Sequence, residues 1–317
     1  MIKINLAKLN NTIHNKINEN LSVTSTIFQT YDFLKIWTDN FPIDYRILEI
    51  YEDNQQVGYL PVSIEDNQIE ILGTTAVLGN EQVTDFGDIS SIKGKENQVW
   101  QVILEYLKKN YSGYKLTLNF IRESSPSFNI LKKYQPDPVK VATSPYIKLP
   151  KSWDEYLNGL KRKSRQELKR KMRRLEALNY KNYFAEKDDN NIKTFLNLMK
   201  KSSNEKNSFL TDKMEVYFRQ LMQNFDKKRL LLWFMEIGNK VVASVIVFRF
   251  KNQIQLYNSG VDTEYNYYSV GLLSKAFLIK WAIENGFEIY DFLQGNERYK
   301  YDLGAVNNPL YKFEIIL

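Results

Sequence analysis

The chain of 317 residues contains no cysteine and a single histidine, His14. Without cysteine there are no disulfides, no thiolate metal sites and no cysteine nucleophile. One histidine excludes a metal site built from several histidines, and a Ser-His-Asp triad would have to use His14 itself. Because His14 lies in a polar amino-terminal stretch, we expect it to be an ordinary surface residue and expect no bound metal.

Long apolar runs are also missing. The longest, such as residues 241–248, are far shorter than the roughly 18 residues that a membrane-spanning helix needs. The amino-terminal segment MIKINLAKLNNTIHNK has no apolar signal core. We therefore expect a soluble, cytoplasmic protein with no transmembrane segment. Hydrophobic residues make up 43% and charged residues 26% of the sequence, which is ordinary for globular domains.

Positive charge is concentrated in one segment. The net charge is +7, and residues 161–174 (KRKSRQELKRKMRR) hold nine basic residues and one acidic residue, a sum of +8. The rest of the chain therefore sums to 7 − 8 = −1. Such a run is usually a solvated helix face; the alternatives are contact with substrate phosphates, with tRNA or with a membrane surface. Its apolar stripe of Leu168, Met172 and Leu175 is too narrow for deep membrane insertion.

Hydrophobic periodicity predicts the order of the elements. Helices are expected at residues 31–40, 96–110, 153–178 (as one helix or two), 192–204, 212–224 and 272–284. Strands are expected at residues 45–51, 56–64, 68–72, 114–121, 229–237, 241–250, 253–261, 287–293 and 310–317. Pro61 lies inside its predicted strand and therefore favours an edge strand or a bulge.

A cluster of prolines between residues 126 and 150 indicates a connector between two halves. Each half has the same coarse order of helix, antiparallel strands, helix and strand. We predict an α/β fold of the α+β kind with mixed sheets. It consists of two related halves, residues 1–150 and 151–317, with a cleft between them.

A turn and a polar loop near the carboxyl terminus are the first candidate site. A tight turn with one glycine, Gly271, precedes the apolar helix at residues 272–284, and a short strand leads to a polar loop at residues 294–300. Free N–H groups at a helix amino terminus suit an anion such as a pyrophosphate. The alternative is an ordinary turn that leads into a core helix.

Several motifs follow one another in an order typical of one family. They are residues 152–157, the basic segment 162–174, residues 241–243 (VVA), residues 268–273 (YSVGLL) and residues 291–300 (DFLQGNERYK). They resemble the GNAT-superfamily acyltransferase domains of the BioF2-like and CelD-like type, which are related to the FemAB peptidoglycan aminoacyltransferases. Residues 28–37 and 57–62 resemble the amino-terminal half of that family. Val270 stands where the family often has proline, but Gly271 keeps the turn flexible.

The resemblance implies a tandem GNAT-like fold and transfer of an acyl group to an amine or a hydroxyl. The implied donor is acetyl-CoA or another acyl-CoA, and the implied acceptor is a small molecule or a nucleotide-linked or cell-envelope saccharide. Two alternatives stay open: a FemAB-type aminoacyltransferase that uses charged tRNA, and a non-catalytic binding module that uses the basic segment. The donor's phosphates are assigned to the turn, at Tyr268, Ser269, Val270, Gly271 and Leu272.

Lys300 is the sharpest catalytic candidate, because an ammonium group stabilises the negative charge that develops on the carbonyl oxygen during acyl transfer. The resemblance pairs it with Tyr299, and the alternative is a surface lysine on a loop. Asp291 and Glu297 are the nearest candidate bases. Asp291 ends a strand, so capping of a neighbouring element explains it somewhat better than catalysis.

Four further residues are candidates for substrate binding. Asp85 and Asp88 would hold a cationic or hydroxylated acceptor, although turn chemistry explains them equally well. Arg162 and Arg165 in the basic segment would contact phosphates of the substrate.

Overall fold

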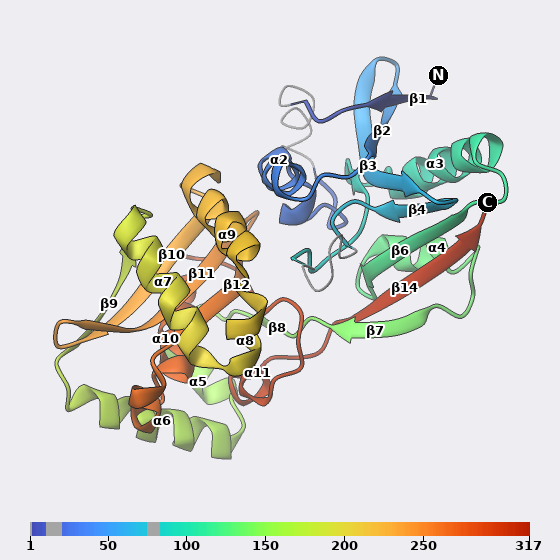
Figure 1. The fold of residues 1–317 in the computed structure, drawn as a ribbon. Coiled ribbons are helices and arrows are strands. Elements are labelled where there is room, and N and C mark those ends of the chain that lie inside the picture. The colour runs from blue at the N-terminus through green and yellow to red at the C-terminus, as the bar shows by residue number, and fades with distance from the viewer. Residues whose placement is uncertain (1, 11–20, 75–82) are drawn as a thin grey trace. The chain divides into compact units, whose positions relative to one another are not determined.

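The computed structural model describes residues 2–10, 21–74 and 83–317 (Figure 1). The chain forms two compact units, one of residues 1–142 with 308–317 and one of residues 143–307. These units differ from the expected halves of 1–150 and 151–317, because the last strand, β14 (Pro309–Ile316), pairs with β6 (Lys115–Arg122). His14 lies outside the described residues.

The first unit is built on a mixed eight-stranded sheet. Its strand order is β1-β2-β3-β4-β6-β14-β7, and β5 pairs with β3. The other strands are β1 (Ile2–Ala7), β2 (Tyr45–Glu52), β3 (Gln55–Glu65), β4 (Gln68–Ile71), β5 (Ser90–Ser91) and β7 (Val139–Thr143). The helical segments are η1 (Ile27–Gln29), α2 (Tyr31–Asn40), α3 (Glu96–Asn110) and α4 (Pro126–Leu131). The apolar face of α3 and the sheet share one hydrophobic core.

Pro61 lies inside the sheet, so of the two expected alternatives the edge strand is wrong, whereas β3 does have a register shift, between Gln56 and Gly58. Its strand β3 pairs with β2 on one side and with β4 and β5 on the other. On that second side β5 pairs with Gly58 and Tyr59, whereas β4 pairs from Val62 onward. Pro61 falls between these two partners, where a missing N–H costs no ladder hydrogen bond.

The second unit contains a six-stranded sheet with the order β8-β13-β12-β11-β10-β9. Its strands are β8 (Tyr146–Lys148), β9 (Tyr180–Ala185), β10 (Leu230–Ile237), β11 (Lys240–Phe250), β12 (Gln253–Val261) and β13 (Ile289–Asp291). Its helices are α5 (Trp153–Gly159), α6 (Arg162–Glu176), α7 (Asp189–Ser202), α8 (Asn204–Phe209), α9 (Asp212–Asn224), α10 (Val270–Glu284) and α11 (Arg298–Asp302), with a 3-10 turn, η2 (Thr263–Tyr268).

Helices cover both faces of this second sheet (Figure 1). Ala243, Val245 and Val247 of β11 share a core with α10 and with Leu168 and Leu175 of α6. On the opposite face Phe248 packs against Phe225, which follows α9, with 5.2 Å between ring centroids. The apolar stripe of α6 is thus used in the core, which leaves its basic residues outside.

The two units repeat one topology. In each, an antiparallel three-stranded meander (β2-β3-β4 and β10-β11-β12) is followed by a helix (α3 and α10) and then by a strand parallel to the third (β6 and β13). The expected helices and strands form in the expected order and the mixed α+β sheets are confirmed, whereas β1, β5, β7, β8, β9, α4, α8 and α11 were not expected. Among the described helices none is both long and apolar enough to cross a membrane.

Candidate active site

The amino terminus of α10 presents two backbone N–H groups. Ser269, just before the helix, has the left-handed values φ 56° and ψ 35°, and its carbonyl accepts bonds from the N–H groups of Leu272 and Leu273 at 3.0 and 2.9 Å. Among the described residues the N–H groups of Val270 and Gly271 have no acceptor. Because Val270 is the first helical residue, proline would lose no hydrogen bond there, and the turn forms with either residue. Free N–H groups and the helix dipole together favour an anion here.

Helix α6 brings a cation to this turn. The guanidinium of Arg174 donates to the carbonyl of Tyr267 at 2.7 Å and lies 4.2 Å from the centroid of the Tyr267 ring. Arg162 lies twelve residues earlier on α6, ~18 Å along the helix axis. Arg165 donates to the carbonyl of Asn158 at 3.1 Å and so joins α5 to α6. The structure therefore places Arg174, which the sequence did not single out, nearest the turn, and not Arg162 or Arg165.

Asp291 holds the backbone that follows β13. It is 6% exposed, and its Oδ1 accepts from the Ser144 hydroxyl at 2.9 Å and from the N–H of Leu293 at 2.8 Å. Leu293 has a positive φ of 54°, a conformation that costs free energy and needs such support. These bonds favour the capping interpretation of Asp291 over the role of a base.

Lys300 is buried, which excludes the interpretation as a surface lysine. Its side chain is 1% exposed, and Nζ donates to the carbonyls of Gln294 at 2.7 Å and Gly295 at 3.2 Å. Nζ also lies 3.0 Å from the Glu297 carboxylate, which is 57% exposed. Lys300 therefore fixes the conformation of the loop before α11, and its one carboxylate partner among the described residues, Glu297, is exposed to solvent.

Two more lysines that the sequence reading missed lie near Lys300. Nζ of Lys275, on α10, donates to the carbonyl of Gly271 at 2.9 Å and lies 5.2 Å from the centroid of the Tyr299 ring. The pKa of Lys275 is lowered to about 7, chiefly by burial and also by the charges of Lys206 and Lys300, while the charge of Glu297 opposes the shift. Lys206, on α8, donates to the carbonyl of Ser259, and burial lowers its pKa to about 8.

We call Lys206, Lys275, Lys300 and Glu297 the lysine cluster. Their charges act on one another, since three lysines, of which Lys275 is only partly protonated at neutral pH, surround one carboxylate. Tyr299 lies among them, and burial, followed by the charge of Glu297, raises the pKa of its phenol. The phenol therefore stays protonated at neutral pH. A positive excess in a low-dielectric setting is suited to stabilising negative charge.

The lysine cluster lies beside a free edge of β12. Strand β13 pairs with β12 only at residues 253–255 of β12, whereas β12 continues to Val261. Further along this strand Lys206 donates to the Ser259 carbonyl, and the Ser202 hydroxyl accepts from the Val261 N–H at 2.7 Å. The part of β12 beyond residue 255, which does not pair with β13, therefore lies next to the lysine cluster.

The two aspartates proposed to bind the acceptor, Asp85 and Asp88, differ in exposure. Asp88 is fully buried and accepts from the hydroxyls of Ser125 (2.6 Å) and Ser127 and from the N–H of Ile89. The expectation that Asp88 binds an acceptor is therefore corrected, because these bonds tie it to the start of α4 and no surface of it is open. Asp85 is partly exposed and stays a candidate.

Comparisons with known proteins bear on the second unit's domain family and on the fold of the whole chain. Residues 162–301 match the acetyltransferase (GNAT) domain family, and no curated protein matches the sequence. Over 99% of the chain the fold is similar to 97% of the crystal structure of FemX, with 12% identity and a TM-score of 0.68. A conserved protein from Bacteroides thetaiotaomicron VPI-5482 gives 12% identity over 99% of this chain and 100% of that chain, with a TM-score of 0.65.

A third similar structure is L-PGS from Bacillus licheniformis, with 10% identity over 90% of each chain and a TM-score of 0.56. At these identities the likeness concerns the fold alone. Together with the repeated topology it confirms the predicted tandem fold, which is similar to the fold of FemX.

Proposed function

We propose an acyl-transfer reaction for this protein, from the premise that residues 162–301 form an acetyltransferase (GNAT) domain within a FemAB-related fold. The observation that carries the proposal is the lysine cluster beside the amino terminus of α10. Two free amides and Arg174 lie at one end of this helix, and an excess of positive charge lies one turn further on.

The donor proposed is acyl-CoA, with acetyl-CoA first. Its pyrophosphate would accept from the N–H groups of Val270 and Gly271 and face the guanidinium of Arg174. Tyr268, Ser269 and Leu272 complete the turn and set its backbone conformation. The thioester would then lie along the free edge of β12, toward the lysine cluster.

The reaction would proceed by direct attack. The acceptor nitrogen or oxygen forms a bond to the thioester carbonyl carbon, negative charge develops on the carbonyl oxygen, and the C–S bond breaks to release a thiolate. The ammonium groups of the lysine cluster stabilise both negative charges. Glu297, the exposed carboxylate of the cluster, takes the proton that the acceptor loses, and the thiolate is finally protonated.

The acceptor class rests on the resemblance and is part of the proposal. It is a small molecule or a saccharide of the cell envelope, including a nucleotide-linked sugar, and Asp85 is the candidate for its recognition. Such an acceptor is compatible with a cytoplasmic enzyme that makes peripheral contact with a membrane.

A second candidate donor is aminoacyl-tRNA. It is favoured by the exposed basic face of α6, where Arg162, Lys163, Lys169, Arg170 and Arg173 reach solvent. Binding of a polyanion would weaken steeply as salt increases, whereas binding of acyl-CoA would change far less. Titrations at 50 and 200 mM salt, as round values for the comparison, separate the two donors.

Release of CoA from acetyl-CoA with a panel of amino sugars and amines tests the function. Glu297→Gln should lower kcat at least tenfold, because general-base catalysis contributes roughly 10²–10⁴. The matched control is Glu284→Gln, an exposed carboxylate on α10, which should keep wild-type turnover. Full activity of Glu297→Gln would remove Glu297 from the mechanism, and absence of acyl transfer from both donor types would refute the function.

A further inference from the structure

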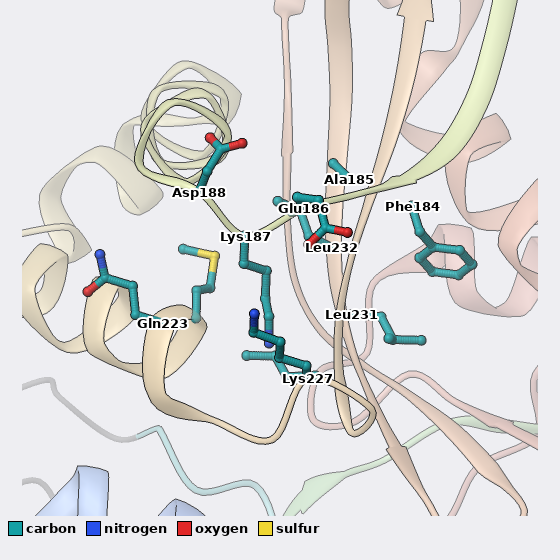
Figure 2. A pocket seen from close by; sticks show the side chains of 11 residues that line it. Phe184, Ala185, Glu186, Lys187, Asp188, Gln223, Lys227, Leu231 and Leu232 are labelled. Atoms are coloured by element: carbon teal, nitrogen blue, oxygen red, sulfur yellow. The ribbon is translucent and has the colours of Figure 1, made fainter.

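A cavity separate from the candidate active site lies in the second unit. Its volume is about 420 Å³, within the range of pockets that bind small molecules. Figure 2 shows its lining residues, which come from the end of β9, the segment before α7, α9 and the loop into β10. Strand β10 begins at this cavity, at Leu230. The amino terminus of α10 lies beside Val261, which pairs with Ala243, and Ala243 pairs with Met235 near the other end of β10. The cavity and the candidate active site therefore lie toward opposite ends of this strand.

The walls of the cavity combine apolar surface with two lysines. Phe184 and Leu231 are the partly exposed apolar side chains of the lining, and Met222, Leu230 and Leu232 are buried behind its surface. Lys187 and Lys227 are the basic side chains of the lining, and Figure 2 shows both extending into the same space below the loop that follows β9. A ligand that matches this lining has an apolar body and an anionic end.

Lys187 is only partly satisfied by the protein. It is half-buried, and its Nζ has a long bond of 3.4 Å to the carbonyl of Phe225. The pKa of Lys187 is lowered to about 8, chiefly by burial and also by the charge of Lys227, while the charges of Asp226 and Glu186 oppose the shift. An ammonium held in this way gains from any anion that supplies short, charge-assisted bonds.

The acidic groups at the rim do not neutralise the lysines. Asp188 caps α7, where it accepts from the backbone N–H of Asn191 at 2.9 Å and from its side-chain amide at 3.0 Å. Glu186 is exposed to solvent. Gln223 donates to Asp189 at 2.8 Å and is therefore directed toward α7. The two ammonium groups are left as the polar groups that a ligand can use.

We propose that this cavity binds a carboxylate that carries a short aliphatic chain. The carboxylate lies between the ammonium groups of Lys187 and Lys227, and the chain packs against the partly exposed Phe184 and Leu231. The site does not depend on the acyl-transfer reaction, so either proposal can fail without the other.

Isothermal titration with sodium octanoate tests this site, with octanamide as the neutral analogue and inorganic phosphate as the anion without a chain. Octanoate should bind the wild-type protein at least tenfold more tightly than either analogue. Lys187→Gln and Lys227→Gln should each weaken octanoate binding, by tenfold or more for Lys187→Gln, which corresponds to about 1.4 kcal/mol. The control Lys228→Gln changes an adjacent exposed lysine outside the lining and should bind as the wild type does.

Melting curves accompany each titration to show that the variants fold. Equal affinity for octanoate and octanamide would contradict the role of the lysines, and equal affinity for octanoate and phosphate would contradict the role of the apolar wall. Absence of octanoate binding to folded wild-type protein would overturn the proposal outright.

Discussion

Lys275 is a cation inside an apolar helix. It is 5% exposed on α10, between Ser274 and Ala276, and its nearest partner is the carbonyl of Gly271. Neither a carboxylate within salt-bridge distance nor a second acceptor compensates its burial among the described contacts. A buried charge is costly, so such a residue lowers the stability of the protein. Its presence is expected where it serves a function.

Replacing Lys275 by methionine should stabilise the protein at neutral pH. The pKa of Lys275 is lowered from 10.5 to about 7, so between pH 7 and 10.5 the unfolded chain binds more protons and stability rises with pH. Below about pH 7 the charged form is present in both states and its full cost applies. Lys275→Met should therefore raise the melting temperature most near pH 6–7, and the gain should shrink toward pH 10.

Melting curves of wild type, Lys275→Met and the control Lys280→Met, an exposed lysine of the same helix, measure this difference. The control should follow the wild type at every pH. If the melting temperature of Lys275→Met differs from that of the wild type by the same amount from pH 6 to 10, the charge of Lys275 is not the cause of the lower stability of the wild type.

Single residues of the site were only partly predictable from the sequence. Lys300 was identified through a motif, but its burial depends on carbonyls of a loop whose conformation no motif reveals. Lys206 and Lys275 were not predicted. For Lys275 the sequence does contain a signal, a lysine within the otherwise apolar helix α10. The proximity of Lys206 to Lys275 arises only when α8 packs against β12, which is long-range information.

At the scale of elements, Gly260 allows α7 to pack closely on β12. A Cβ atom at this position would lie 2.4 Å from the backbone N of Met199 and 2.5 Å from the carbonyl carbon of Leu198. The close approach also lets the Ser202 hydroxyl accept from the Val261 N–H. The contact thus fixes α7, and with it α8 and Lys206, at the free edge of β12.

Gly260→Ala should destabilise the protein by about 1–3 kcal/mol, because the backbone of α7 must move away. Urea denaturation measures this change in the free energy of unfolding. Gly159→Ala is the control, since an added Cβ there meets no atom within 4 Å, and its effect should stay within about 0.5 kcal/mol. Equal stability of the two variants would show that α7 does not depend on close contact at Gly260.

The helices and strands themselves follow from local pattern. The expected helices at residues 31–40 and 96–110 coincide with α2 and α3, because apolar spacing and terminal residues are local properties. The expected helix at residues 153–178 is split into α5 and α6 at Leu160, which is extended with φ −68° and ψ 147°. Periodicity alone left open whether this stretch forms one helix or two. The edge position that Pro61 suggested for its strand is wrong, because the gap between β4 and β5 that accommodates Pro61 depends on the arrangement of the sheet and not on the strand's own sequence.

At the scale of the whole molecule, the two units do not coincide with the two halves of the sequence, because one strand from each half belongs to the other unit. Strand β14, at the end of the chain, completes the first sheet, while β8, just after the first unit, pairs with β13 of the second. Both strands occupy equivalent positions beside β6 and β13. Their partners lie more than one hundred residues away in sequence, so pattern predicts the strands but not which sheet each one joins.

Binding of acetyl-CoA tests the central claim, that α10 and α6 together hold the phosphates of an acyl donor. Isothermal titration should give a dissociation constant of about 1 μM to 1 mM for the wild type, the usual range for substrates. Arg174→Gln should weaken binding about tenfold, as expected for the loss of a charge-assisted bond. Arg173→Gln, which alters an exposed arginine of the same helix, should bind as the wild type does. No binding of acetyl-CoA to folded wild-type protein, or equal losses in both variants, would contradict the claim.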